Sequence, residues 1–376
     1  MRKISYKKVG LLVMAASLGL GFNSCKDKEV DEEQVFSEIL ESYVDNTVIA
    51  TYANLADKAL ELSDLCQQLK AQPSQAAVDV AAQKWKEARV FWEQSEAFLY
   101  GPADFRNLDP HIDSWPLDKN QLDQTLARPD VDNLDATEAR ATLGVNLLGF
   151  HAIEYVLFKD GQPRSYAEIP ARELTYCAAV AGVLAEDCIL LEASWKGINN
   201  ISQAKAEILA AADLSITDEY GNQMKNAGKT GSRYSSQKTA INEIIEGCKD
   251  IADEVGNSKI QDPVQSGDVL KVESWYSWNS IADFCDNIRS IENAYLGGIP
   301  AQRSHSLSSY IASIDKEKKT DLDGEIKSNI NNAITKIQAI GSPFRNHLDN
   351  KTGANEATDA CDELFNSLNK ISQHIQ

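Results

Sequence analysis

A histidine and a glutamate lie three residues apart near the middle of the chain, in the segment Gly149–Phe158 (GFHAIEYVLF). On a helix, His151 and Glu154 project from the same face, one turn apart. Their neighbours are apolar or aromatic, and burying a polar group there without a partner costs roughly 2–7 kcal/mol. The pair is therefore predicted either to open onto a cleft as a binding site or to form a buried hydrogen bond that only holds helices together.

The residue types favour a cation as the ligand of such a site. Carboxylates with one imidazole suit iron better than a thiolate site would. A hydrolytic zinc site usually needs three protein ligands and one open position for water. The H-E-x-x-H motif is absent, and His151 and Glu154 supply two ligands at most. A third ligand would have to come from Glu96, Asp113 or the second half of the chain.

Arg89 and Trp115 are the other candidates for this site. Arg89 lies seven residues before Glu96, too far for the closest helical contact. We therefore expect its guanidinium to reach another carboxylate, Glu154 or Asp113, and to hold that group ionised; a purely structural network is the alternative. Several tryptophans could line a ligand cleft, although aromatic residues on helical faces are more often core: Trp92, Trp115, Trp275 and Trp278.

Apolar residues recur at helical spacing through most of the chain, and no segment alternates with period two over more than a few residues. The class is therefore all-α. The pattern predicts helices over residues 32–70, 78–95, 135–158, 167–195, 202–213, 241–255, 269–296, 307–314, 326–340 and 357–375. Residues 102–118 are expected to form a long irregular loop, and residues 214–235, rich in Gly, Ser, Asn and Thr, a mobile excursion.

Two helical domains are expected, each resembling a four-helix bundle, at residues 26–200 and 201–376. A short internal echo links them, because Glu96–Gly101 (EAFLYG) and Glu292–Gly297 (ENAYLG) both place a glutamate five residues before a glycine. If the echo is not a coincidence, the domains form a pseudo-twofold pair whose glutamates approach one interface. That arrangement would give a ligand cleft between them.

Charge and the N-terminus bound the function further. The chain carries a net charge of −19, and the first 25 residues contain four basic and no acidic residues, so the remainder carries −23. A surface this negative repels phosphate backbones, which argues against nucleic-acid binding. Residues 1–25 have a basic start, an apolar run and Cys25 after a small residue, as in a bacterial lipoprotein signal peptide. We expect lipidation of Cys25 and anchoring in the outer membrane, facing the periplasm or the cell surface; a cleaved secretory signal is the alternative.

The remaining cysteines are scattered through helical patterns without zinc-ribbon spacing. In an exported chain, disulfide bonds between these cysteines are the alternative, but buried free thiols are favoured for most of them. They are Cys66, Cys177, Cys188, Cys248, Cys285 and Cys361.

Several stretches together resemble the imelysin-like family of exported bacterial proteins, also classed as insulin-cleaving peptidases. In family order they are Ala88-Arg89 with Trp92, Glu96-Ala97-Phe98 before Gly101, residues 112–118 (IDSWPLD), 149–154 (GFHAIE), 251–255 (IADEV) and 293–297 (NAYLG). The resemblance implies two four-helix-bundle-like domains with a pocket at their interface, a link to bacterial iron uptake with iron-transport partner proteins, and a peptidase label. The Trp-rich stretch 274–283 departs from the family pattern.

Together these observations favour a cell-envelope binding protein that captures iron, zinc or a small metal-bearing ligand between its domains. His151 and Glu154 are the expected metal ligands, and Arg89, Glu96, Asp113 and Trp115 are expected to shape the site. The alternatives are a metallopeptidase that uses the His-x-x-Glu pair as zinc ligands, and a scaffold in which the pair only clamps helices.

Overall fold

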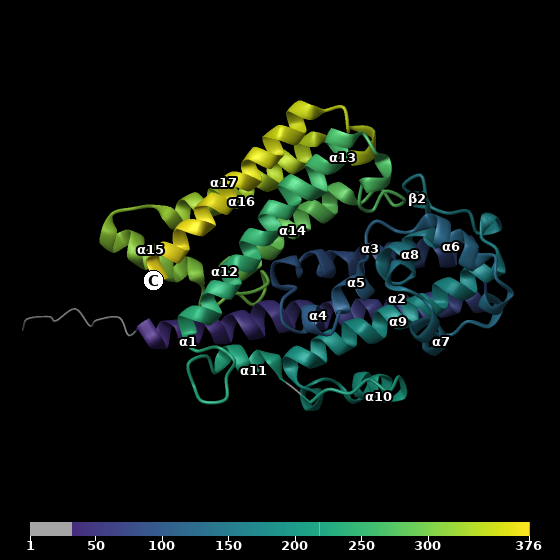
Figure 1. The fold of residues 1–376 in the computed structure, drawn as a ribbon, viewed down its shortest axis with the longest axis horizontal. Coiled ribbons are helices and arrows are strands. Elements are labelled where there is room, and N and C mark those ends of the chain that lie inside the picture. The colour runs from purple at the N-terminus through teal and green to yellow at the C-terminus, as the bar shows by residue number, and fades with distance from the viewer. Residues whose placement is uncertain (1–31, 218, 376) are drawn as a thin grey trace, which may run out of the picture.

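The structure is a computed structural model that describes residues 32–217 and 219–375, and it is built almost entirely of helices (Figure 1). The predicted signal peptide and Cys25 lie outside the described residues. Within them, strands occur only in a two-stranded antiparallel hairpin, β1 (Phe158–Lys159) and β2 (Gln162–Pro163). The all-α prediction is confirmed.

The first bundle is formed mainly by α2 (Ala50–Ala71), α3 (Gln75–Glu93), α8 (Gly149–Leu157) and α9 (Ala171–Lys196). Helix α1 (Glu32–Ser42) runs into α2 through η1, a π-helix over Tyr43–Ile49. Helix α9 is apolar on nearly every face, which is typical of a helix enclosed on all sides. Although α9 is long and apolar enough to cross a membrane, most of it is buried in the centre of this bundle.

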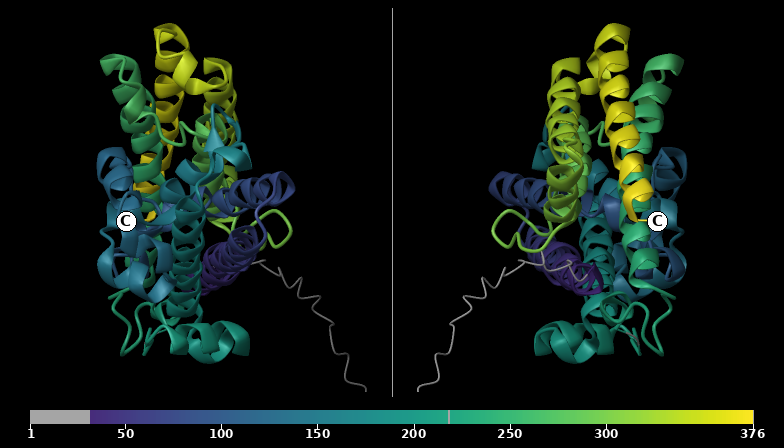
Figure 2. Two further views of the ribbon diagram at one scale, coloured as in Figure 1. Left: turned by 90° about the vertical axis from the view of Figure 1, so that its right-hand side faces the viewer. Right: turned by 90° about the vertical axis from the view of Figure 1, so that its left-hand side faces the viewer.

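The second bundle is formed by α12 (Gln237–Asp253), α14 (Ser280–Tyr295), α16 (Leu322–Ile340) and α17 (Lys351–Ile375). Helix α17 packs against α12 and α16, and α14 packs against the same two helices. Helix α15 (Leu307–Lys318) lies against α16. In the two side views the second bundle, coloured green to yellow, rises from the first (Figure 2).

Short helices connect these elements. They are η2 (Glu96–Phe98), α4 (Pro102–Phe105), α5 (Leu108–Ile112), α6 (Lys119–Leu126), η3 (Pro129–Asn133), α7 (Ala136–Thr142), η4 (Val145–Leu147), η5 (Tyr166–Glu168), η6 (Ile198–Asn200), α10 (Gln203–Ala211), α11 (Tyr220–Lys225), η7 (Glu254–Ile260), α13 (Gln261–Ser266), η8 (Val269–Lys271) and η9 (Phe344–Asn346). Two predicted helices, 135–158 and 269–296, are wrong as continuous elements. The first breaks before Gly149, and the second begins only at Ser280.

The segment after α9 belongs to the first bundle. Helices α10 and α11 pack against α9, and α11 also contacts α1 and η1. Within the predicted mobile excursion, Tyr220, Met224 and Tyr234 are buried, and the hydroxyls of the two tyrosines lie 2.8 Å apart. These side chains therefore attach the segment to the first bundle, and its mobility stays a prediction. Helix α12 is the first long helix of the second bundle, and the domain boundary at residue 201 stays a prediction.

Close contacts join the two bundles where η2 meets α12 and α14. A Cβ on Gly247 would lie 2.2 Å from the carbonyl oxygen of Ala97, and the Ala97 N–H donates to Ser290 Oγ at 3.1 Å. A second contact joins η1 of the first bundle to α14 of the second, where Thr47 Oγ1 donates to the carbonyl oxygen of Asn293 at 3.3 Å. Glu292, which the echo matches with Glu96, pairs with Arg303 at 2.9 Å. The pseudo-twofold relation stays a prediction.

The six cysteines from Cys66 onward are buried and free, as predicted for most of them. Two of them, Cys66 on α2 and Cys177 on α9, lie with their sulfur atoms 3.7 Å apart.

Candidate functional site

A glycine fixes the start of α8 against the loop that carries Asp113. Gly149 has φ +76°, and a Cβ there would lie 2.2 Å from the carbonyl oxygen of Ile112. The indole N–H of Trp85 donates to the carbonyl oxygen of Phe150 at 2.9 Å and attaches α8 to α3. Because the backbones approach this closely, His151 on the first turn of α8 comes within bonding distance of Asp113.

Substituting Gly149 with alanine is therefore expected to lower the free energy of unfolding by roughly 2–5 kcal/mol, from the left-handed backbone and the clash with Ile112. Gly144 provides a matched control, because it has φ −73° and a Cβ there would meet nothing within 4 Å. Gly144→Ala is expected to change stability by less than about 0.5 kcal/mol. Urea denaturation of both variants measures the difference, and equal losses would contradict the argument.

His151 is completely buried and held from both sides by carboxylates. Its Nδ1 lies 2.9 Å from Glu154 Oε2, and its Nε2 lies 3.0 Å from Asp113 Oδ1. Burial is the largest influence and would lower the pKa of His151, but the charge of Asp113 and the close contacts with Asp113 and Glu154 together outweigh burial and raise the pKa to about 9. Without a bound cation, the ring is thus an imidazolium at neutral pH that donates from Nδ1 to Glu154 and forms an ion pair with Asp113 through Nε2.

Glu154 lies on the side of His151 away from Asp113. Its Oε2 faces the imidazole, and its Oε1 accepts the backbone N–H of Ser277 at 2.8 Å. Both oxygens are engaged, one of them by the second bundle. His151 and Glu154 were predicted to open together onto a cleft. Glu154 instead lies behind the ring and orients it, and Nε2 of His151 points toward the acidic groups.

Arg89 occupies the centre of those acidic groups and is fully buried. Its Nη1 donates to Asp113, the second of the two partners predicted for it. Its Nη2 contacts Glu93 and lies 2.9 Å from Glu273, and its Nε lies 3.7 Å from Asp283. Among the described residues, Glu154 is not one of its partners.

Asp113 is the residue at which these contacts converge. Besides Arg89 and His151, the indole N–H of Trp92 donates to its Oδ2 at 2.6 Å. Burial would raise the pKa of Asp113, but the charges of Arg89 and His151 outweigh burial and hold the pKa well below its usual range. Asp113 is therefore an anion across the physiological range.

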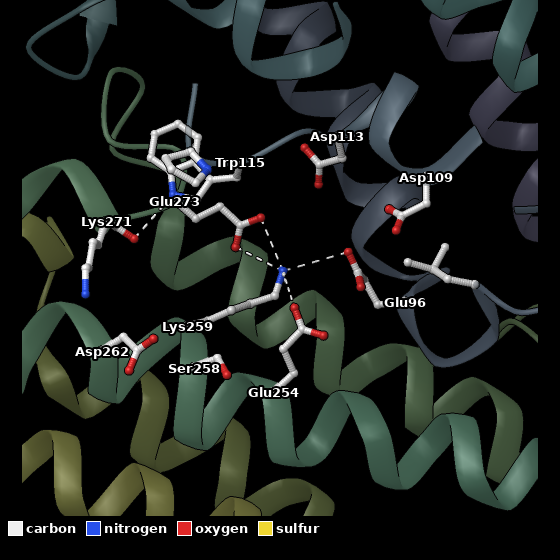
Figure 3. Close-up of a pocket in the computed structure, with 12 residues that line it drawn as sticks. Glu96, Asp109, Asp113, Trp115, Glu254, Ser258, Lys259, Asp262, Lys271 and Glu273 are labelled. Atoms are coloured by element: carbon white, nitrogen blue, oxygen red, sulfur yellow. Dashed lines mark hydrogen bonds and ion pairs between the residues drawn. The ribbon is translucent and has the colours of Figure 1, made fainter. Parts of the chain in front are cut away.

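A cavity of about 450 Å³ opens beside this network, between the two bundles (Figure 3). The first bundle contributes three predicted site residues to its lining, Glu96, Asp113 and Trp115. Further polar lining residues are Asp109 from α5 and Glu254, Ser258, Lys259, Asp262, Lys271 and Glu273 from the second bundle. Arg89, His151 and Glu154 are not part of this lining and lie in the wall behind Asp113.

Lys259 extends into the cavity from the π-helix η7. Its ammonium lies 3.0 Å from Glu273, 3.8 Å from Glu96 and 3.9 Å from Glu254 (Figure 3). Burial would lower the pKa of Lys259, but the surrounding carboxylates outweigh it and raise the pKa well above its usual value. A permanent positive charge therefore occupies the acidic cavity.

Carboxylates nevertheless exceed cations in this region. Burial raises the pKa of Glu93 and of Glu96 well above the usual range, and it raises those of Asp109 and Asp283 to about 6. Neighbouring carboxylates add to the increase, while Arg89 and Lys259 only partly oppose it. An excess of buried negative charge favours uptake of protons or of another cation.

The donor geometry fits a metal ion. One atom each from Asp113, His151 and Glu273 lie within 4.8 Å of one another, and a second such set joins Glu93, Glu96 and Asp113. An imidazole with two carboxylates is a donor set that iron and zinc accept. Glu154 would serve as the hydrogen-bond partner that fixes the ligating ring, a recurring feature of metal-bound histidines. The predicted direct ligation by Glu154 is not what this geometry favours.

Four further residues of this centre were not predicted from the sequence: Glu93, Lys259, Glu273 and Asp283. Only Glu93 carries a signal along the chain, since it lies four residues after Arg89 on the same helix. Glu273 lies in the loop before α14 and Asp283 in the first turn of α14, and both meet Arg89 only through tertiary packing. Lys259 lies on a π-helix, where the helical register assumed from the sequence does not hold.

These features define an all-α protein with a buried acidic centre between two helical bundles. The family model described as Imelysin matches residues 48–371, so the chain belongs to the imelysin family. The resemblance drawn from the sequence is confirmed.

Particular relatives are similar over most of their length. A protein named iron-regulated protein A from Synechococcus elongatus is 27% identical over 292 residues, which cover 75% of this chain and 71% of the relative. The crystal structure of an iron-regulated protein A precursor from Parabacteroides distasonis is 33% identical with a TM-score of 0.79, covering 92% of this chain and 96% of the other. An imelysin-like protein from Psychrobacter arcticum, 15% identical with a TM-score of 0.61 over 91% and 93% of the chains, shares the fold.

Proposed function

We propose that this protein binds an iron ion, or a small ligand carrying one, in the acidic cavity between its bundles. The observation that carries the proposal is the convergence of Asp113, His151 and Glu273, from both bundles, within 4.8 Å beside a cavity of about 450 Å³. The names of two relatives, both iron-regulated protein A, support iron as the metal.

The electrostatics support a cation rather than an anion as the ligand. The lining carboxylates exceed the lining cations, and the pKa values of Glu96 and Asp109 are raised by burial and by neighbouring acids. A multivalent cation relieves this repulsion more effectively than a proton does. His151 would offer Nε2 after losing its proton, because Nδ1 is held by Glu154.

We place this activity at the cell envelope, with residues 1–25 as a lipoprotein signal peptide and Cys25 as the lipid anchor in the outer membrane. The basic start, apolar run and cysteine of the N-terminal segment support this placement. Iron-transport proteins of the envelope would then be the natural partners. A metallopeptidase using the same centre stays the alternative, and chelator-sensitive cleavage of an unfolded protein would support it.

Calorimetric titration of the purified protein with Fe²⁺ under anaerobic conditions, and separately with Zn²⁺, tests the proposal. We expect one ion per chain, with affinity at least about 10-fold weaker in His151→Ala. The matched control is His305→Ala, since His305 also faces a carboxylate, Glu38 at 3.2 Å, but is 59% exposed and does not line the cavity. If the wild-type protein binds neither metal, or if both substitutions weaken binding equally, the proposal fails.

A further inference from the structure

A second cavity, of about 250 Å³, lies where the β1–β2 hairpin of the first bundle meets the second bundle. It shares no lining residue with the acidic cavity. The loop between η8 and α14 contributes Trp275 and Tyr276, and η9 contributes Arg345. The end of α8 contributes Tyr155. The two sides of the cavity therefore come from parts of the chain that are more than 100 residues apart.

The walls of this cavity are aromatic. The rings of Tyr155 and Tyr276 meet edge to face with centroids 5.3 Å apart, and those of Trp275 and Tyr276 lie 4.4 Å apart at 31°. Phe158 also lines the cavity and is buried. Such walls offer flat apolar surface to a ligand ring, and edge-to-face or offset contacts with aromatic side chains add to area burial.

Arg345 gives the cavity a positive charge that makes no ion pair among the described residues, although the carboxylate of Asp160 also belongs to the lining. Its guanidinium carbon lies 4.4 Å from the centre of the Trp275 ring, and Nη1 donates to the Trp275 carbonyl oxygen at 3.4 Å. Within 32–217 and 219–375, no carboxylate lies within 4.0 Å of it. The other cations at this cavity are paired, Arg164 with Glu173 and Lys159 with Glu168.

Spare hydrogen-bonding capacity accompanies that charge. A guanidinium has five N–H donors in a planar fork suited to a carboxylate, and Arg345 uses one of them on the carbonyl of Trp275. The hydroxyl of Tyr276 makes no hydrogen bond within the described part of the chain, whereas that of Tyr155 donates to Asp123 at 2.7 Å. In a chain of net charge −19, a free arginine between aromatic walls favours an anionic ligand with a ring.

We propose that this cavity binds a small aromatic carboxylate, with its ring against Tyr155, Trp275 and Tyr276 and its carboxylate on Arg345. The volume is below the roughly 300–1,000 Å³ of pockets for drug-sized ligands, which suits a single ring. The site is separate from the cation centre, and the inference does not depend on the proposed function.

Calorimetric titration with benzoate tests the proposal, with benzamide as the uncharged probe of the same shape. We expect one benzoate to bind per chain. Benzamide should bind at least about 10-fold more weakly than benzoate, because it lacks the charge that Arg345 would bind. Arg345→Gln should lower the affinity for benzoate about 10- to 100-fold. The matched control is Arg303→Gln, which removes an arginine paired with Glu292 outside the cavity and should leave affinity unchanged.

A second variant tests the aromatic wall without touching the charge. Tyr155→Leu should weaken benzoate at least several-fold while leaving thermal unfolding cooperative. Absence of saturable binding up to about 10 mM benzoate, equal affinity for benzamide, or unchanged affinity in Arg345→Gln would each overturn the proposal. Binding that Arg345→Gln weakens but Tyr155→Leu does not would overturn the assignment of the ring to this wall.

Discussion

Replacing Arg89 with methionine is expected to lower the free energy of unfolding by about 3–5 kcal/mol at pH 8, the largest effect of any single substitution in the acidic centre. The guanidinium has no exposed surface and contacts Asp113, Glu93, Glu273 and Asp283. Methionine fills a similar volume but leaves those carboxylates buried without their shared cation. The loss measures uncompensated buried charge rather than lost packing.

The size of this loss should depend on pH. In the folded protein, burial raises the pKa of Glu93 well above its unfolded value and that of Asp283 to about 6, with Arg89 opposing the increase. Removing Arg89 raises both values further. A group whose pKa is higher in the folded state stabilises it at low pH and loses that contribution as pH rises through the folded pKa. The variant should therefore be closest to the wild type near pH 5 and farthest from it near pH 8.

Urea denaturation at pH 5 and pH 8 measures both effects. Arg89→Lys keeps a charge but lacks the planar fork of the guanidinium. Its free energy of unfolding should therefore lie between those of Arg89→Met and the wild type. Arg128→Met is the control, because Arg128 pairs with Asp130 at the surface with 50% of its side chain exposed. It should leave the free energy of unfolding close to that of the wild type, because exposed ion pairs contribute little. An Arg89→Met loss that is independent of pH would show that packing, not charge, explains the effect.

The helical class was predictable because apolar spacing reports burial directly. Helix α9 is the clearest case, since its sequence is apolar on nearly every face and the helix is enclosed by its neighbours. The break before α8 was not predictable in the same way. It depends on Gly149 meeting the carbonyl of Ile112, a tertiary contact that leaves the apolar period on either side unchanged. Helical spacing therefore continued through a position where the chain turns.

The candidate site was predictable only on the side of the first bundle. His151, Asp113, Arg89 and Glu96 lie in stretches whose residue types stand out against apolar surroundings. Glu273 lies in no such pattern, and its contact with Arg89 spans 184 residues. The order of Glu154, His151 and Asp113 was also hidden, because spacing shows that two side chains share a helix face but not which atom each turns toward the other.

Replacing Lys259 with methionine is expected to tighten binding of Fe²⁺ or Zn²⁺ at least about 10-fold. Its ammonium stands in the acidic cavity, 3.0 Å from Glu273 and 3.8 Å from Glu96 (Figure 3). Glu273 belongs to the donor set with Asp113 and His151. A metal ion must therefore compete with this ammonium for Glu273 and be repelled by it, at a cost of roughly 3 kcal/mol per unit charge at about 5 Å and an effective dielectric constant of 20.

Lys271→Met provides the matched control for that prediction. Lys271 also lines the cavity, but its side chain is exposed and makes no ion pair within the described residues. Both variants remove one positive charge from the same cavity, so a general electrostatic effect would tighten binding similarly in the two. If the ammonium of Lys259 is the internal competitor, calorimetry will show a gain in Lys259→Met several times larger than in Lys271→Met. Weaker metal binding in Lys259→Met would mean instead that the lysine holds Glu273 and Glu96 in the arrangement that the metal requires.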